Sequence, residues 1–162
     1  MKKLLLILLC LPFIGFGQKE NPVSTENKYC NYLYNNTLQK NIFTILVNSN
    51  NQLLVEGELM DISQLKDGAT RFINNNGMDP NSSDNPEKAI ISLQNDRGTE
   101  YITYIRVQNE LAAAYTDLRN NASLNKFGER YADLNKTQQK EIKKMYPQKI
   151  SEAEPKNIGG DE

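Results

Sequence analysis

The sequence predicts an α+β fold: a small mixed β-sheet with two main helices on one face, plus a short C-terminal helix and strand. Three observations lead to this prediction. Short runs rich in β-branched residues occur at 42–47 and 89–94, as in well-buried strands. A cluster of turn-forming residues follows the first run. Two segments with helical periodicity begin near residues 61 and 99, and strands separated by helices need crossover connections, so the sheet should be mixed.

The first two strands are expected to form a hairpin. The run 42–47 reads Ile-Phe-Thr-Ile-Leu-Val, and the turn cluster 48–51 reads Asn-Ser-Asn-Asn. Asparagine and serine are common in turns because their side chains hydrogen-bond to the nearby backbone. Residues 52–56 then read as the second strand, which Gly57 and Glu58 close. The domain therefore begins with an antiparallel pair.

Asp61 is expected to open the first helix. Its carboxylate can accept hydrogen bonds from exposed backbone N–H groups, and Gln64 completes the spacing of a capping box. The apolar residues that follow recur on one helical face. They are Ile62, Leu65, Ala69, Phe72 and Ile73. The helix should end at 74–77, and the composition of 77–88 predicts a loop.

A third strand at 89–94 and a turn at 95–98 lead into the longest helix. Thr99 is its expected N-cap, and the helix should run to about Asn121. Its expected apolar face consists of Tyr101, Ile105, Leu111, Ala112, Tyr115 and Leu118. Tyr101, Tyr104 and Tyr115 are also considered as a binding platform. The helical phase puts Tyr101 and Tyr115 on the core face and favours packing.

The C-terminal part is expected to add a short helix and a last strand. Gly128 ends an irregular or helical extension of the long helix, and Asn135 with Gln138 has capping-box spacing before a charged helix over 136–146. Pro147 stops that helix, 148–152 is the last strand, and 155–162 is a disordered tail. The predicted core of the whole domain is Ile45, Val47, Leu54, Leu65, Phe72, Ile91, Leu93, Ile105, Leu111 and Leu118.

The first residues have the layout of a secretory signal peptide. Met1-Lys2-Lys3 is a basic start, and the apolar run from Leu4 to Gly17 is shorter than the ~20 residues of a membrane span. Gly15 and Gly17 suit cleavage before Gln18. We therefore expect a signal peptide over 1–17, a linker over 18–40 and a periplasmic location, or an inner-membrane anchor if the signal is not cleaved. Cys30 is expected to be an inert cysteine rather than a bridging one.

The composition argues against several function classes. The 162 residues include no His, which removes the commonest general base and metal ligand. A net charge of −1 disfavours nucleic-acid binding. The carboxylates of Glu56, Glu58 and Asp61 could form a cation site or a hydrolytic acid/base pair, but strand-end and capping roles explain them better. No catalytic residue, cofactor or metal site is therefore expected.

Asp96 and Arg97 are the candidate partner-binding residues. A paired acid and base at a strand-to-helix turn can dock another protein. The competing interpretation is that Asp96 caps the turn and Arg97 is solvated, and the sequence does not choose between the two.

Several separated blocks of this sequence resemble the periplasmic domain of the ExbD/TolR family, in its Bacteroidetes-type ExbD form. The blocks are Asn-Ile-Phe-Thr-Ile-Leu-Val-Asn at 41–48, Gln-Leu-Leu-Val-Glu-Gly-Glu at 52–58, Asp-Ile-Ser-Gln-Leu at 61–65, Ala-Ile-Ile-Ser-Leu-Gln-Asn-Asp-Arg-Gly-Thr at 89–99 followed by Tyr101, Val-Gln-Asn-Glu-Leu-Ala-Ala-Ala-Tyr at 107–115, and Tyr-Pro-Gln-Lys-Ile-Ser-Glu-Ala-Glu-Pro at 146–155. The resemblance covers about 41–156 and assigns 41–154 to an ExbD-like periplasmic domain. It implies a small sheet with two helices on one face.

The resemblance also implies a function. ExbD proteins work beside ExbB and TonB in biopolymer transport, converting proton flow into force on envelope proteins. The expected role is a non-enzymatic component of such a system, with TonB-like and ExbB/ExbD-like partners and self-pairing to a homodimer as a further option. The family's membrane helix carries an aspartate, whereas the first Asp here is Asp61, so no residue inherits that role. The alternative is a free-standing periplasmic module that binds cell wall or another envelope protein.

Overall fold

The computed structural model describes residues 39–153. The expected signal peptide, nearly all of the expected linker, Cys30 and the expected tail lie outside the described residues. The strands are β1 (Ile42–Val47), β2 (Leu53–Val55), β3 (Glu58–Met60), β4 (Ile90–Asn95) and β5 (Ile150–Glu152). The helices are α3 (Ile62–Ile73), α4 (Tyr101–Phe127), the 3-10 turn η1 (Tyr131–Asp133) and α5 (Lys136–Met145).

The strands form one mixed sheet in the order β3-β2-β1-β4-β5. β1 pairs antiparallel with β2, as the hairpin prediction required, and parallel with β4, while β5 is parallel to β4 at one edge. The predicted α+β fold is therefore confirmed. β3, which the sequence did not predict, pairs antiparallel with β2. It forms because Glu56 and Gly57 both take positive φ, 53° and 87°, which makes a tight turn that returns the chain.

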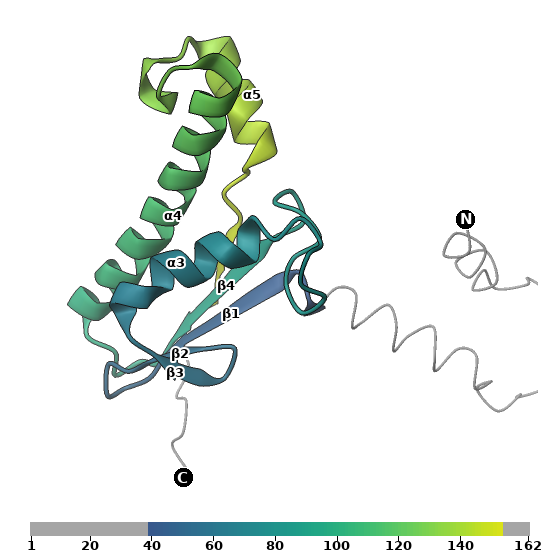
Figure 1. Ribbon diagram of the computed structural model, residues 1–162. Coiled ribbons are helices and arrows are strands. Elements are labelled where there is room, and N and C mark those ends of the chain that lie inside the picture. Colours follow the sequence, from purple (N-terminus) through teal and green to yellow (C-terminus); the bar gives the residue numbers. More distant parts are fainter. Residues whose placement is uncertain (1–38, 154–162) are drawn as a thin grey trace, which may run out of the picture. The chain divides into compact units, whose positions relative to one another are not determined.

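The core lies between one face of the sheet and the two long helices, α3 and α4 (Figure 1). Alternate residues of β1 and β4 point into it, because successive strand side chains point to opposite faces. These are Phe43, Ile45, Val47, Ile91 and Leu93. The other face of the sheet carries no helix among the described residues, and its side chains, including Leu46, are only half-buried.

The phase of β2 differs from the prediction. Leu53 and Val55 are buried and Leu54 is not, so Leu54 was wrongly placed in the core. The register explains this, since Leu54 pairs with Leu46 and both point to the uncovered face. When all residues of a strand are apolar, the sequence alone does not indicate which alternate side chains point into the core.

The start of α4 also differs from the prediction. Glu100, not Thr99, is the N-cap residue, and the helix continues to Phe127, past the expected end. The Thr99 hydroxyl instead donates to the carbonyls of Val47 and Asn48 at 3.1 and 3.2 Å. Tyr101 and Ala112 were predicted on the apolar face of this helix but are exposed, and Ile105, which was predicted in the core, is only half-buried.

Helix α3 begins where the capping pattern predicted. The Asp61 carboxylate accepts from the backbone N–H of Ser63 at 2.8 Å and from the Ser63 hydroxyl at 2.6 Å. These hydrogen bonds lower the pKa of Asp61. Gln64 takes no part in the cap with its side chain, so the predicted capping box is absent here. The full box does form at Asn135 and Gln138, at the start of α5.

The segment between α3 and β4 is a loop organised around one buried amide. The Asn75 side chain donates to the carbonyls of Asp79 and Ser83, both at 2.8 Å, and accepts from the Asp79 backbone N–H. Asp84 lies between the ammonium groups of Lys40 and Lys88, which lower its pKa to about 2. Polar contacts thus replace secondary structure in holding this loop.

The second half of α4, η1 and α5 form a helical tip, defined here as residues 119–146, that projects past the end of the sheet (Figure 1). Leu134 and Ile142 are buried in the tip and do not belong to the main core. The Arg119 guanidinium donates to the Tyr146 carbonyl at 2.9 and 3.1 Å, which fixes the end of α5 against α4. No helix within residues 39–153 is long and apolar enough to cross a membrane.

Candidate partner-binding surface

The turn that carries Asp96 and Arg97 is fixed to the end of β1. The backbone N–H of Asp96 donates to the Val47 carbonyl at 2.8 Å. The Asp96 carboxylate accepts from the backbone N–H of Gly98 at 2.7 Å, and the side chain is 8% exposed. Asp96 therefore builds the turn, as one of the two interpretations of this residue held, while Arg97 beside it is exposed.

Further contacts make this turn rigid. The backbone N–H of Glu100 donates to the Asn51 side chain at 2.8 Å, so the β1–β2 loop holds the start of α4. Gly98 approaches this loop closely, because a Cβ on Gly98 would lie 3.0 Å from the Cβ of Ser49. Any side chain at that position would push the two segments apart. The exposed residues of the turn are therefore attached to a rigid backbone.

Beside this turn lies a shallow pocket with exposed aromatic and charged residues. It has a volume of about 310 Å³ and is lined by Asn95, Asp96, Arg97, Thr99, Tyr101 and Tyr104. Tyr101 is 75% exposed, and its ring centroid lies 6.3 Å from that of Tyr104. Ile102 beside it is 53% exposed. Large side chains of this kind are seldom left in water together without a role in contacts.

The pocket adjoins the edge strand β5. The Tyr104 hydroxyl donates to Glu152 at 2.8 Å, and the Gln108 amide donates to the same carboxylate. The hydrogen bond to the Glu152 carboxylate raises the pKa of the Tyr104 hydroxyl, and partial burial adds to that effect. This network ties β5 to α4. It therefore places the pocket and the sheet edge on one continuous surface.

The three tyrosines considered as a platform separate into two roles. Tyr115 is buried, and burial raises the pKa of its hydroxyl, which accepts from the Lys149 backbone N–H at 3.3 Å. Tyr101 is exposed and Tyr104 is half-buried. The sequence assigned Tyr101 to the core because it lies near the helical phase of Tyr115. Its position in the first turn of α4, beyond the edge of the core, was not visible in the periodicity.

The carboxylates considered for hydrolysis have structural contacts. Glu56 accepts from the Thr44 backbone N–H through its side chain and Asp61 caps α3, while Glu58 is exposed at the edge of β3. Within the described part of the chain, no group of three or more His, Cys, Asp or Glu side chains is arranged to hold a metal ion.

Sequence reasoning missed a second concave surface. A groove of about 870 Å³ runs between α3, the β2–β3 hairpin and the loop after α3. Its apolar lining includes Phe43, Met60, Phe72 and Met78, of which Met78 is 84% exposed. The rings of Phe43 and Phe72 lie 4.9 Å apart at its floor. The one sequence signal for this groove is that two methionines, Met60 and Met78, flank α3 on its two sides.

In comparisons with known proteins, no family model matches this chain, and no curated protein matches it in sequence. The assignment of a function therefore depends on the geometry described above and on the resemblance of the sequence blocks.

Proposed function

We propose that this protein is a non-enzymatic periplasmic component of a TonB–ExbB–ExbD-like energy-transduction system, and that it acts by binding other envelope proteins. The observation that carries the proposal is the exposed group Arg97, Tyr101 and Ile102, placed on a rigid turn beside the edge strand β5. A small sheet with two helices on one face, as the ExbD resemblance implies, is compatible with it.

These residue types suit a protein interface. Tyrosine and arginine are enriched among the residues that dominate binding energy. Tyrosine buries a large area with little loss of side-chain freedom, and the planar arginine guanidinium offers five hydrogen-bond donors in a fixed geometry. The turn holds them in place before a partner arrives, which reduces the entropic cost of association. We therefore expect the binding energy to be concentrated in Tyr101 and Arg97.

The adjacent strand edge offers a second mode of contact. In β5, the Lys149 carbonyl and the Ala153 N–H bond to β4, so the backbone groups of Ile150 and Glu152 point away from the sheet. No further strand lies beyond β5 in the described sheet. An extended segment of a partner can therefore add to this edge by backbone hydrogen bonds while its side chains reach Tyr101 and Arg97.

Site-specific cross-linking tests the proposal. A photo-reactive amino acid replaces Tyr101 in cells that also produce ExbB-like, ExbD-like and TonB-like proteins. We expect a cross-link to at least one of these three from position 101. Leu124 is the matched control, since it is also on α4 and is 47% exposed but lies in the helical tip.

Equal cross-linking from both positions, or none from position 101, contradicts the proposal. Co-sedimentation with purified cell wall separates the two candidate functions. If the protein sediments with cell wall and Tyr101→Ala does not change the amount that sediments, the free-standing binding module is favoured instead.

For export, we expect the intact mass of the periplasmic protein to correspond to a chain that begins at Gln18. A full-length mass in the membrane fraction contradicts cleavage.

A further inference from the structure

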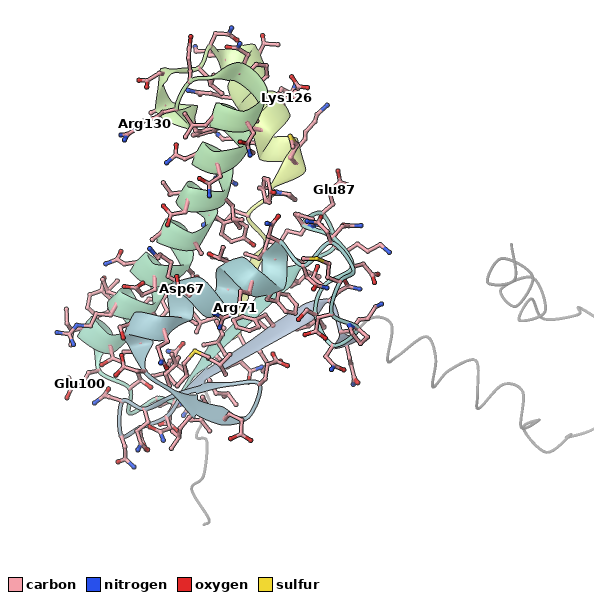
Figure 2. All side chains as sticks on the ribbon, viewed as in Figure 1. Asp67, Arg71, Glu87, Glu100, Lys126 and Arg130 are labelled. Carbon is pink, nitrogen blue, oxygen red and sulfur yellow. The ribbon has the colours of Figure 1, made fainter. Side chains whose placement is uncertain are left out.

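Charge is segregated between the two ends of the described domain. The helical tip, residues 119–146, contains seven Lys and Arg residues and three Asp and Glu residues, a net charge of +4. The remaining described residues, 39–118 and 147–153, contain seven basic and twelve acidic residues, a net charge of −5. Figure 2 shows Lys126 and Arg130 at the tip and Glu100 at the opposite end of α4. The near-neutral chain therefore conceals a strongly basic end.

Most of that positive charge lies on one face of α5. Lys136, Lys140, Lys143 and Lys144 fall within about 100° of arc at 3.6 residues per turn, and they span about 12 Å along the axis. All four are exposed, and the buried Ile142 lies on the opposite side of the helix. Among the described residues, none of the four makes an ion pair. We call these four residues the lysine face.

The lysine face is held in a fixed orientation. The capping box at Asn135 sets the start of α5, and Ile142 anchors its middle. Glu141, the one acidic residue of α5, is turned to Lys126 of α4 in an ion pair. The helix therefore cannot rotate its lysines toward the acidic part of the domain, and they remain directed outward.

The acidic residues of the body do not offer a matching surface for a second copy. Asp84 is neutralised by Lys40 and Lys88, and Asp117 pairs with Lys66 at 3.2 Å. The others are spread over the β2–β3 turn, β3, α3, the loop after α3, the turn before α4, α4 and β5. Within residues 39–153, no acidic surface therefore matches the lysine face.

We propose that the lysine face binds the anionic headgroups of a lipid bilayer. The face contains only lysines, which are point charges on flexible stems, and no arginine fork or aromatic ring of the kind that selects one fixed partner. Its convex shape contacts a flat surface but cannot enclose a small anion. The tip also extends past the sheet, so the lysines can reach a bilayer while the acidic body stays away from it (Figure 1).

The expected strength is modest and depends on salt. One lysine near an anionic bilayer increases partitioning by about five-fold, which corresponds to about 1 kcal/mol. Four such lysines multiply to roughly six-hundred-fold at most, of which we expect about a hundred-fold to remain near 0.1 M salt, where the Debye length is about 10 Å. This binding is separate from the proposed partner surface at Tyr101, which lies at the other end of α4.

The test is flotation of the full chain with vesicles of phosphatidylcholine alone or mixed with phosphatidylglycerol. The variant Lys136→Gln, Lys140→Gln, Lys143→Gln, Lys144→Gln removes the lysine face and keeps helix-forming residues. We expect it to lose roughly a hundred-fold in partitioning to the anionic vesicles relative to the neutral ones. The neutral vesicles correct for any contribution of the apolar N-terminal segment.

The matched control carries Lys66→Gln, Arg71→Gln, Lys88→Gln and Arg106→Gln, which removes the same charge from the acidic body. It should stay within about three-fold of the original chain, because those charges are screened from the bilayer. Equal losses in both variants, or equal binding of the original chain to the two vesicle types, would overturn the proposal. So would tighter binding to a DNA duplex than to anionic vesicles, or self-association that the lysine-face variant abolishes.

Discussion

The sheet with its two packed helices and the helical tip are stabilised in different ways. In the body, buried side chains from three strands and two helices form one continuous cluster. In the tip, Leu134 and Ile142 are the buried apolar residues outside that cluster, and hydrogen bonds such as Arg119 to the Tyr146 carbonyl complete the packing. The helix α4 is shared by both regions.

Helix α4 carries the tip as a small appendage beyond the main core. Stability from burial grows with the apolar area removed from water, so the body should unfold as one unit. The tip has little apolar area of its own and depends on α4 as a scaffold. We therefore expect the tip to open locally at a lower free energy than the body.

The largest effect is expected in the body. Leu111→Ala removes a fully buried side chain from the main core and should lower the free energy of unfolding by about 2–5 kcal/mol. Denaturant melts measure the loss, and it should appear in all elements together. Leu59→Ala is the control, since Leu59 is 67% exposed, and it should change stability by less than about 0.5 kcal/mol. A similar loss in both variants would contradict the assigned core.

The next effect separates the two regions. Ile142→Ala removes the side chain that anchors α5, at a local cost of about 2–4 kcal/mol. Amide hydrogen exchange should accelerate in α5 and η1 while the protection of β1 and β4 stays unchanged. Uniform acceleration throughout the domain would show that body and tip are one cooperative unit.

A smaller effect concerns the pH dependence of the stability of the body, which contains Asp84. The flanking ammonium groups of Lys40 and Lys88 lower the pKa of Asp84 from 3.8 to about 2 in the folded protein. A carboxyl group with a lowered pKa stabilises the fold above its unfolded pKa, and that contribution is lost as the pH falls from about 4 through about 2. Asp84→Asn should remove this part of the acid sensitivity. Melts of both proteins across this range measure it, and identical pH profiles would contradict the assignment.

The smallest effect concerns the tip. The hydroxyl of Tyr131 is buried without a hydrogen-bond partner within the described chain. A buried polar group without a partner costs free energy, so Tyr131→Phe should leave stability unchanged or raise it by up to about 1 kcal/mol. Exchange rates in η1 and α5 report the change. A clear destabilisation would mean that this hydroxyl has a partner, such as a buried water.

Much of the described domain follows from local sequence signals. The hairpin turn at 48–51, the Asp61 cap, the apolar face of α3 and the Asn135 capping box each depend on a few neighbouring residues, and each is present in the structure, except for the Gln64 half of the first cap. The candidate site was partly visible. Arg97 was named from its place in a turn, whereas Tyr101 was assigned to the core and only the structure exposes it.

The fold class, the order of most elements and the charge of each segment can be predicted from local sequence signals, because periodicity, caps and turn residues act over a few positions. The phase of β2, the existence of β3, the roles of Thr99 and Tyr101, and the outward direction of the lysine face depend instead on long-range contacts. These depend on which distant segment lies opposite each residue. A run such as Leu53-Leu54-Val55 can bury either set of side chains, and only its pairing with β1 selects one.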